Sequence, residues 1–257
     1  MIRQSANIIG LCNRGIVPAQ KQPESPETRA AVARVYTALR IPIVDGEMPP
    51  GTRIKIDAVA RELGVSQTPV REALQRLESD DLLVYTPGRG YRTTPMLDFK
   101  GLRSLFEFRL LVEPWAARSV ATDRLSNPGP ALAKELEDFE RIADRDGDVR
   151  QMMLAHDARF HEIILAATGN DVVGQAYAQT HCHLHVFRLF PVDFDGAITI
   201  AEHRTILDAI SSCDRDAAEL AMAEHIRKSF ERSAEAFDEP PAEELSRDVP
   251  RRIHIQR

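Results

Sequence analysis

The sequence predicts a mostly α-helical protein, in which an N-terminal winged helix-turn-helix precedes an antiparallel all-α bundle of about six helices. Three observations predict this. A glycine turn joins two short amphipathic patterns within residues 58–77, a basic glycine-rich hairpin pattern comes next, and after Leu97 strand signals give way to long helical patterns. With 257 residues, 43% of them hydrophobic, the chain is long enough for two domains.

The chain divides where its composition and periodicity change. The expected segments are a flexible leader (1–27), a winged helix-turn-helix domain (28–96), an all-helical domain (97–237) and a flexible tail (238–257). The leader is expected to be flexible because residues 21–26 are too rich in proline for a helix. Residues 28–43 then carry apolar side chains at helical spacing, so a first helix should brace the helix-turn-helix.

The two short helices meet at Gly64. Glycine tolerates the positive φ that ends one helix and redirects the chain, so Gly64 is the expected turn. Ser66 is expected to cap the second helix, and Pro69 suits its first turn, where a missing N–H costs nothing. One face of this helix is apolar at i, i+3, i+4 and i+7 and should be buried: Val70, Ala73, Leu74 and Leu77.

The opposite face of the second helix carries Gln67, Thr68 and Arg71. Short polar groups and an arginine at the start of such a helix suit the major groove of DNA. An ordinary helical hairpin is the alternative interpretation. The neighbouring segment favours DNA binding, because residues 82–94 alternate around a basic glycine-rich turn and so predict a β-hairpin wing with Arg89 at its tip.

The net charge of −6 is unusual for a DNA-binding protein until it is divided along the chain. Residues 28–96 hold ten Lys and Arg against eight Asp and Glu, whereas residues 97–237 hold sixteen against twenty-four. The acidic excess therefore belongs to the second domain. The first domain needs only a local basic face for phosphates, which five arginines supply: Arg61, Arg71, Arg76, Arg89 and Arg92.

The spacing of the cysteines and the length of the apolar runs indicate the cellular compartment of the protein. Cys12, Cys182 and Cys213 are odd in number and widely spaced, so they predict neither a disulfide framework nor a thiolate zinc site. The sequence has no run of eighteen apolar residues and no secretory signal pattern. We therefore expect a soluble cytoplasmic protein without a membrane partner.

The second half predicts six helices separated by short caps and breaks. They are expected at 99–122, from 130 to near 144, from 149 to 168, from 171 to before 191, at 197–212 and at 214–237. Helices of this length with short connections pack as an antiparallel bundle.

Histidines in this bundle are candidate metal ligands. Asp157 and His161 lie four residues apart on one helical face, so a carboxylate oxygen and an imidazole nitrogen can converge on one ion. His203 and His225 lie in later helices among residues typical of buried faces. Taken singly, each histidine fits a surface or hydrogen-bonded core position better than a metal site.

A second group of histidines is a rival. His181 and His185 would share a face of one helix, with His183 between them, and imidazole pairs at this spacing can bind metal. No third ligand accompanies them in the sequence, and Arg188 nearby favours a polar lining instead.

The first domain resembles the GntR family of bacterial transcription regulators over residues 30–96. The matching motifs are Gly46-Glu-Met-Pro-Pro-Gly51, Leu63-Gly-Val-Ser-Gln-Thr-Pro-Val-Arg-Glu-Ala-Leu74 and Gly88-Arg-Gly90. The resemblance implies a DNA-contacting set: Arg61, Ser66, Gln67, Thr68, Arg71 and Arg89. Gln67 departs from the family, which most often has arginine there, and glutamine favours adenine over guanine.

The second domain, over residues 98–235, resembles the FCD effector-binding domain of the FadR-like branch of these regulators. The matching pieces are Glu107-Phe-Arg-Leu-Leu-Val-Glu113, Asp157-x-x-Phe-His161, Gly169-Asn170, Glu202-His203 and the helix ending around His225. The resemblance implies one divalent ion per chain, held by Asp157, His161, His203 and His225. Nitrogen-rich ligation with one carboxylate favours zinc or nickel over magnesium or calcium, and manganese is also compatible.

Such an ion keeps coordination positions free for a small carboxylate effector. The expected effector-binding residues are Arg109, which matches a family arginine that faces the pocket, and Asn170. Arg109 has an equally weighted alternative as a structural partner of Glu113 on the same helix.

The leading hypothesis is therefore a transcription regulator that binds a near-palindromic operator as a homodimer and answers to a small organic acid. Two alternatives use the same Asp/His₃ site. A metal-responsive regulator would have the ion as its signal, and a metalloenzyme would use the ion to activate water. Glu162 and Glu202 are the only obvious general bases beside such an enzyme site.

Overall fold

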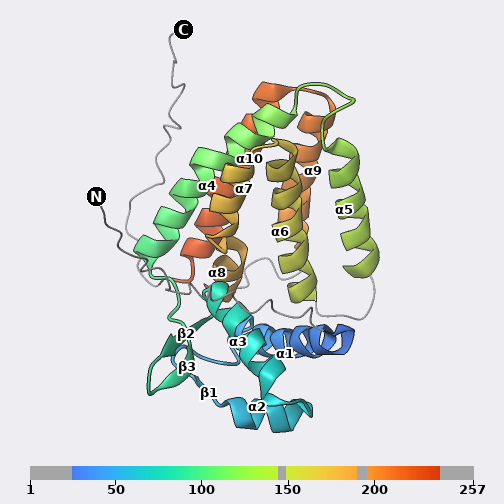
Figure 1. The fold of residues 1–257 in the computed structure, drawn as a ribbon. Helices are drawn as coiled ribbons and strands as arrows, with labels where there is room; N and C mark the ends of the chain where they lie inside the picture. Colours follow the sequence, from blue (N-terminus) through green and yellow to red (C-terminus); the bar gives the residue numbers. More distant parts are fainter. Residues whose placement is uncertain (1–24, 144–148, 190–195, 238–257) are drawn as a thin grey trace, which may run out of the picture.

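The computed structural model of the protein describes residues 25–143, 149–189 and 196–237. Within these ranges two groups of elements form two hydrophobic cores, one in a small winged domain (α1 to β3) and one in a larger helical bundle (α4 to α10). Figure 1 shows the winged domain at one end of the bundle. This confirms the predicted fold class. The predicted tail and nearly all of the predicted leader lie outside the described residues.

The winged domain contains three helices and a three-stranded antiparallel sheet. Its elements are α1 (Pro26–Val44), β1 (Arg53–Ile54), α2 (Ile56–Leu63), α3 (Gln67–Ser79), β2 (Leu83–Thr86) and β3 (Gly90–Thr93). The strand order is β1-β3-β2, and Tyr85 lies opposite Tyr91 across the wing hairpin. Helix α1 begins at Pro26, two residues before the predicted start, because the Ser25 hydroxyl accepts a hydrogen bond from the Thr28 N–H.

The turn between α2 and α3 is as predicted, but its cap differs. Gly64 has φ 63° and ends α2 in the left-handed region. Ser66 has the extended backbone of an N-cap residue, yet its hydroxyl accepts no capping hydrogen bond, so that part of the prediction is wrong. The apolar face of α3 is fully buried against α1 and α2, as its spacing predicted: Val70, Ala73, Leu74 and Leu77.

The bundle consists of helices that enclose a second core. They are α4 (Phe99–Val120), α5 (Gly129–Ala143), α6 (Val149–Ala167), α7 (Asp171–Ala178), α8 (Cys182–Leu189), α9 (Ala197–Ser211) and α10 (Arg215–Ala234). Helices α4 and α10 pack along most of their length. Helix α6 lies inside the bundle between α4, α5, α7 and α8, so its inward side chains reach the centre of the domain.

The fourth expected bundle helix is two helices, α7 and α8. Between them His181 has φ 45°, a left-handed conformation that a continuous helix excludes. The break turns α8 toward the winged domain, and α8 contacts both α1 and α6. Figure 1 shows α8 at the end of the bundle nearest α3. The break also removes His181 from the helix that carries His185.

Helices α6 and α8 join the two cores. Leu154 of α6 is buried in the core of the winged domain, and Phe187 of α8 packs against the same core. Arg150 at the start of α6 donates to the Asp45 carboxylate at 3.0 Å. The buried Arg188 of α8 donates to the carbonyl and the hydroxyl oxygen of Thr94, just after the wing, at 2.9 and 2.8 Å.

Candidate metal centre and DNA-binding surface

The start of α3 forms an exposed polar surface. Gln67, Thr68 and Arg71 are exposed on it, as are Ser66 just before the helix and Arg61 on α2. These are the positions where a recognition helix presents side chains to base edges and phosphates.

The wing faces the same side of the winged domain. One groove is lined by Arg61 of α2, Arg71 of α3, and Tyr85 and Tyr91 of the wing. The two tyrosine rings lie 5.0 Å apart and fix the hairpin locally. Arg89 is exposed at the hairpin tip, so helix and wing together offer a concave surface with several cations.

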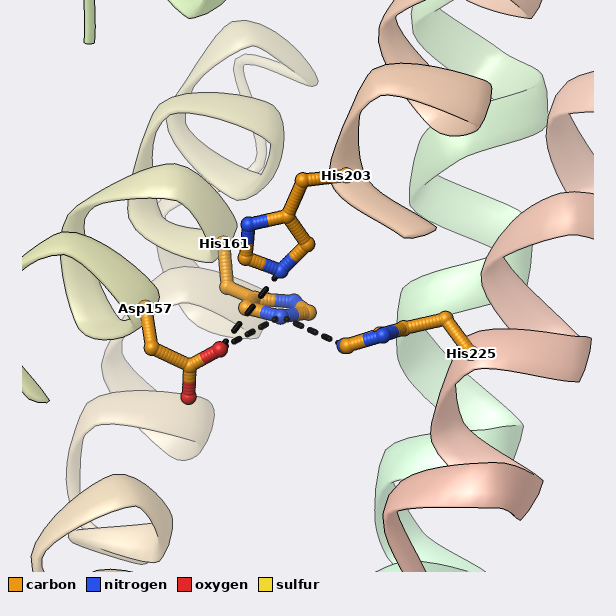
Figure 2. Close-up of side chains that lie close together, drawn as sticks. All are labelled: Asp157, His161, His203 and His225. Atoms are coloured by element: carbon orange, nitrogen blue, oxygen red, sulfur yellow. Dashed lines mark hydrogen bonds and ion pairs between the residues drawn. The ribbon is translucent and has the colours of Figure 1, made fainter. Parts of the chain in front are cut away.

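Four side chains from three helices converge inside the bundle. Asp157 and His161 project from α6, His203 from α9 and His225 from α10, as Figure 2 shows. All four are buried, and one ligand atom from each lies within 4.8 Å of the others. Among the described residues this is the one group of three or more His, Cys, Asp or Glu side chains with that geometry.

The separations between these ligand atoms are close to those around a divalent ion, and two of them are slightly longer. Asp157 Oδ1 lies 3.5 Å from His203 Nε2 and 3.7 Å from His161 Nε2, and the Nε2 atoms of His161 and His225 lie 3.2 Å apart. Ligands placed about 2.1 Å from one ion have neighbouring atoms roughly 3.0–3.4 Å apart. His203 Nε2 is buried without a hydrogen-bond partner in the described part of the chain, as expected for a ligand atom.

Each of the four residues is held from behind by another buried or half-buried side chain. The pairs are His161 Nδ1 with Glu113 Oε2, Asp157 Oδ2 with His183 Nδ1 (2.6 Å), His203 Nδ1 with His156 Nε2 (3.0 Å) and His225 Nδ1 with Glu202 Oε2 (2.8 Å). The His203 ring also stacks on Phe160, with centroids 3.9 Å apart. Such partners fix the tautomer and direct the remaining ligand atom inward.

Burial and neighbouring side chains together set the protonation states of two of the histidines and of the aspartate. Desolvation lowers the pKa of His161 to about 4 and that of His203 well below its usual value. Burial would raise the pKa of Asp157, but the neighbouring His183, His161 and His203 hold it well below its ordinary value. At neutral pH the imidazoles of His161 and His203 are therefore neutral and the carboxylate of Asp157 is ionised, which are the forms that bind cations.

Arg109 lies beside this centre but is engaged. Its Nε donates to Glu113 Oε1 at 2.6 Å, and both side chains are about 1% exposed, which matches the structural alternative considered from the sequence. Tyr177 donates to the same oxygen at 2.8 Å. Arg109 Nη2 has no hydrogen-bond partner among the described residues although it is buried, so one donor remains for a ligand.

Other residues singled out from the sequence lie apart from the centre. Asn170 is exposed, and its side chain accepts from the Val173 N–H at the start of α7, so the structure gives it a capping task. His181 lies 4.0 Å from the Asp80 carboxylate, next to the winged domain. His181 and His185 belong to no described group of converging ligands, which leaves the rival metal pair without support.

His183 is the member of the centre that the sequence did not place. Its position depends on the break between α7 and α8, and no spacing rule connects it with Asp157. Glu113 carried a clearer signal, because it closes the motif that begins at Glu107 and lies one helical turn from Arg109.

Both parts of the chain match known families. The profile described as "Bacterial regulatory proteins, gntR family" matches residues 31–92, and the FCD domain profile matches residues 104–228. The chain belongs to the GntR family. It is a DNA-binding transcription regulator with an FCD effector domain, and not an enzyme.

Individual GntR relatives resemble this regulator along most of its length. An uncharacterized HTH-type transcriptional regulator, YdhC of Bacillus subtilis, is 25% identical over 206 residues, which cover 79% of this chain and 91% of the relative. The galactonate operon transcriptional repressor of Escherichia coli is 28% identical over 224 residues, covering 79% and 96%.

Solved structures of GntR regulators share the fold. A GntR transcriptional regulator from Rhodococcus sp. RHA1 superposes with a TM-score of 0.65 at 22% identity, covering 81% of this chain and 99% of that one. Escherichia coli McbR/YncC superposes with a TM-score of 0.60 at 20% identity, covering 77% of this chain and 94% of that one. In the described part of this GntR regulator, no helix is long and apolar enough to cross a membrane.

Proposed function

We propose that this regulator binds operator DNA as a homodimer and that a small organic acid, anchored on a divalent ion in the bundle, controls the binding. The observation that carries the proposal is the convergence of Asp157, His161, His203 and His225 on one buried point. Three imidazoles and one carboxylate leave positions open in an octahedral shell, and a carboxylate or hydroxyl of the effector would occupy them. Zinc or nickel suits these ligands best, and manganese is compatible.

Arg109 supports an acidic effector. Its buried Nη2 lacks a hydrogen-bond partner among the described residues, and Glu113 holds the guanidinium in place. A carboxylate that binds the ion and accepts from Nη2 would satisfy both groups, since guanidinium groups favour carboxylates. Asn170 is not part of this proposal, because it is exposed at a helix start.

The exposed surface of the winged domain supports a set of DNA-binding residues. We assign operator contacts to six residues: Arg61, Ser66, Gln67, Thr68, Arg71 and Arg89. Membership of a family of bacterial regulatory proteins supports a location beside the DNA, so we also propose the cytoplasm as its location.

Helix α8 offers a route from the metal centre to the winged domain. His183 near its start touches the ligand Asp157, and Arg188 near its end donates to Thr94, just after the wing. Helix α6 makes a second such connection, because it carries both Asp157 and Arg150. Arg150 donates to Asp45, just after the end of α1. An effector that shifts Asp157 would therefore favour one placement of the winged domain over another, which is the differential binding that allosteric control requires.

A surface on α4 and α10 supports the homodimer. Leu111 and Trp115 lie four residues apart on α4 and are 57% and 42% exposed, and Leu220 of the adjoining α10 is 67% exposed. Large apolar side chains exposed on two adjoining helices favour burial against a second copy of the chain. Two recognition helices related by a two-fold axis would then read an inverted repeat.

The test is a screen of small carboxylic acids against the metal-loaded protein bound to an operator selected from random DNA. An acid that changes operator affinity in the parent protein, and no longer does so in His203→Ala, supports the proposal. If removing the metal with a chelator changes operator affinity and no acid does, the ion itself is the signal. If neither treatment affects operator affinity, the metal centre does not control DNA binding.

A further inference from the structure

Gln67, the first residue of the recognition helix, is held by an acidic side chain from α2. Its Nε2 donates to Oδ1 of Asp57 at 2.6 Å, and Asp57 lies in the first turn of α2. Both side chains are exposed, and Asp57 lines the same groove as Arg61 and Arg71. The contact therefore lies on the surface that we propose faces DNA.

The contact fixes which way round the amide lies. An ionised carboxylate only accepts hydrogen bonds, so the NH₂ group of Gln67 must face Asp57 and the carbonyl oxygen must point away from it. One of the two amide hydrogens is used by Asp57. The other hydrogen and the adjacent Oε1 remain, and together they form a donor next to an acceptor.

This remaining pair matches one base in the major groove. Adenine presents the N7 acceptor beside the N6 amino donor, whereas guanine presents two acceptors, N7 and O6. To bind guanine through both acceptors, Gln67 would have to turn its NH₂ group toward the base. That rotation breaks the hydrogen bond with Asp57 and brings Oε1 toward the carboxylate, which repels it.

We propose that Asp57 is a specificity-determining residue, which orients Gln67 so that the regulator selects adenine over guanine at the base pair that this glutamine meets. The inference rests on the proposed DNA-facing role of α3. Asp57 needs no contact with DNA itself. Its negative charge in a basic groove weakens the attraction of phosphates, so it is not expected to strengthen DNA binding overall. Its effect is to penalise guanine through the hydrogen bond that Gln67 would have to break, and a penalty on the wrong partner is a common source of specificity.

The experiment uses the full-length protein and operators selected from a random DNA library. The variant Gln67→Arg locates the base pair that residue 67 meets, because only at that operator position should the preferred base change toward guanine. Two duplexes that differ only in A·T or G·C at that pair then compete for the parent protein, for Asp57→Ala and for Glu62→Ala. Glu62 is the matched control, since it is an exposed acid on the same helix and its loss removes the same charge.

The parent and Glu62→Ala should prefer adenine by roughly 5-fold to 100-fold, the range of one bidentate base contact. Asp57→Ala should lose most of this preference while its binding of the adenine duplex persists. Equal preference in the parent and Asp57→Ala, or a parent that selects guanine, would overturn the inference. If Gln67→Arg changes no position, α3 does not present residue 67 to a base, and the proposed DNA surface itself fails.

Discussion

Nδ1 of His183 lies 2.6 Å from Oδ2 of Asp157, so a residue on α8 holds the outer oxygen of the carboxylate whose inner oxygen faces the imidazoles of His161 and His203. His183 is itself buried, and its Nε2 lies 3.2 Å from the Tyr177 hydroxyl. The carboxylate is thus fixed by a helix that also contacts the winged domain. This connects the geometry of the candidate metal centre with the part of the chain that binds DNA.

Replacing His183 by alanine should weaken metal binding by about 10-fold to 100-fold, because Asp157 loses the partner that orients it. A competition titration with a chromophoric chelator measures the effect. His185→Ala is the matched control, since His185 lies on the same helix as His183, whereas the residue that holds Asp157 is His183. Equal metal affinity in the parent and His183→Ala would show that Asp157 needs no such support.

Replacing Arg188 by alanine should lower the free energy of unfolding by about 1–3 kcal/mol, because the Thr94 carbonyl loses a buried, charge-assisted donor. Denaturant unfolding measures this difference. Arg204→Ala serves as control, since Arg204 forms an exposed ion pair with Glu140 and such pairs contribute little. A loss no larger than that of the control would mean that α8 is not anchored to the winged domain.

Replacing Glu113 by glutamine should destabilise the bundle by about 3–5 kcal/mol, because the buried Arg109 loses its anionic partner. The same change removes the acceptor on His161 Nδ1, so metal affinity should fall as well. Thermal unfolding with and without added metal measures both effects. An unchanged melting temperature would argue against the buried ion pair.

Replacing Trp115 by glutamate should convert the dimer into monomers, because a charge at the proposed interface cannot be buried unpaired. Light scattering at micromolar concentration measures the mass. Leu125→Glu is the control, since Leu125 is 99% exposed and belongs to neither α4 nor α10. A parent protein that is already monomeric, with and without operator, would contradict the homodimer.

The sequence predicted the parts of this fold that local chemistry determines. Gly64 marks a turn because only a residue tolerant of positive φ fits there, and the spacing of Asp157 and His161 places both on one face of α6. Contacts between distant segments were less accessible. The break at His181 depends on how α7 and α8 pack, and with it the meeting of His183 and Asp157.

Side-chain contacts of single residues were also hard to predict. Ser66 occupies a capping position without making the capping hydrogen bond. The prediction failed there because sequence patterns specify backbone placement better than the orientation of a hydroxyl group. Arg109 had two interpretations of equal weight, and only the three-dimensional arrangement shows that Glu113 takes its Nε.

The metal content of the purified protein tests the central claim most directly. Protein without a histidine tag, grown in medium with zinc, nickel and manganese and freed of loose metal by gel filtration, should carry about one divalent ion per chain by elemental analysis. His203→Ala and His225→Ala should carry almost none, with a lower melting temperature than the metal-loaded parent. A parent protein without metal, or variants that retain it, would show that the four residues line a polar pocket and hold no ion.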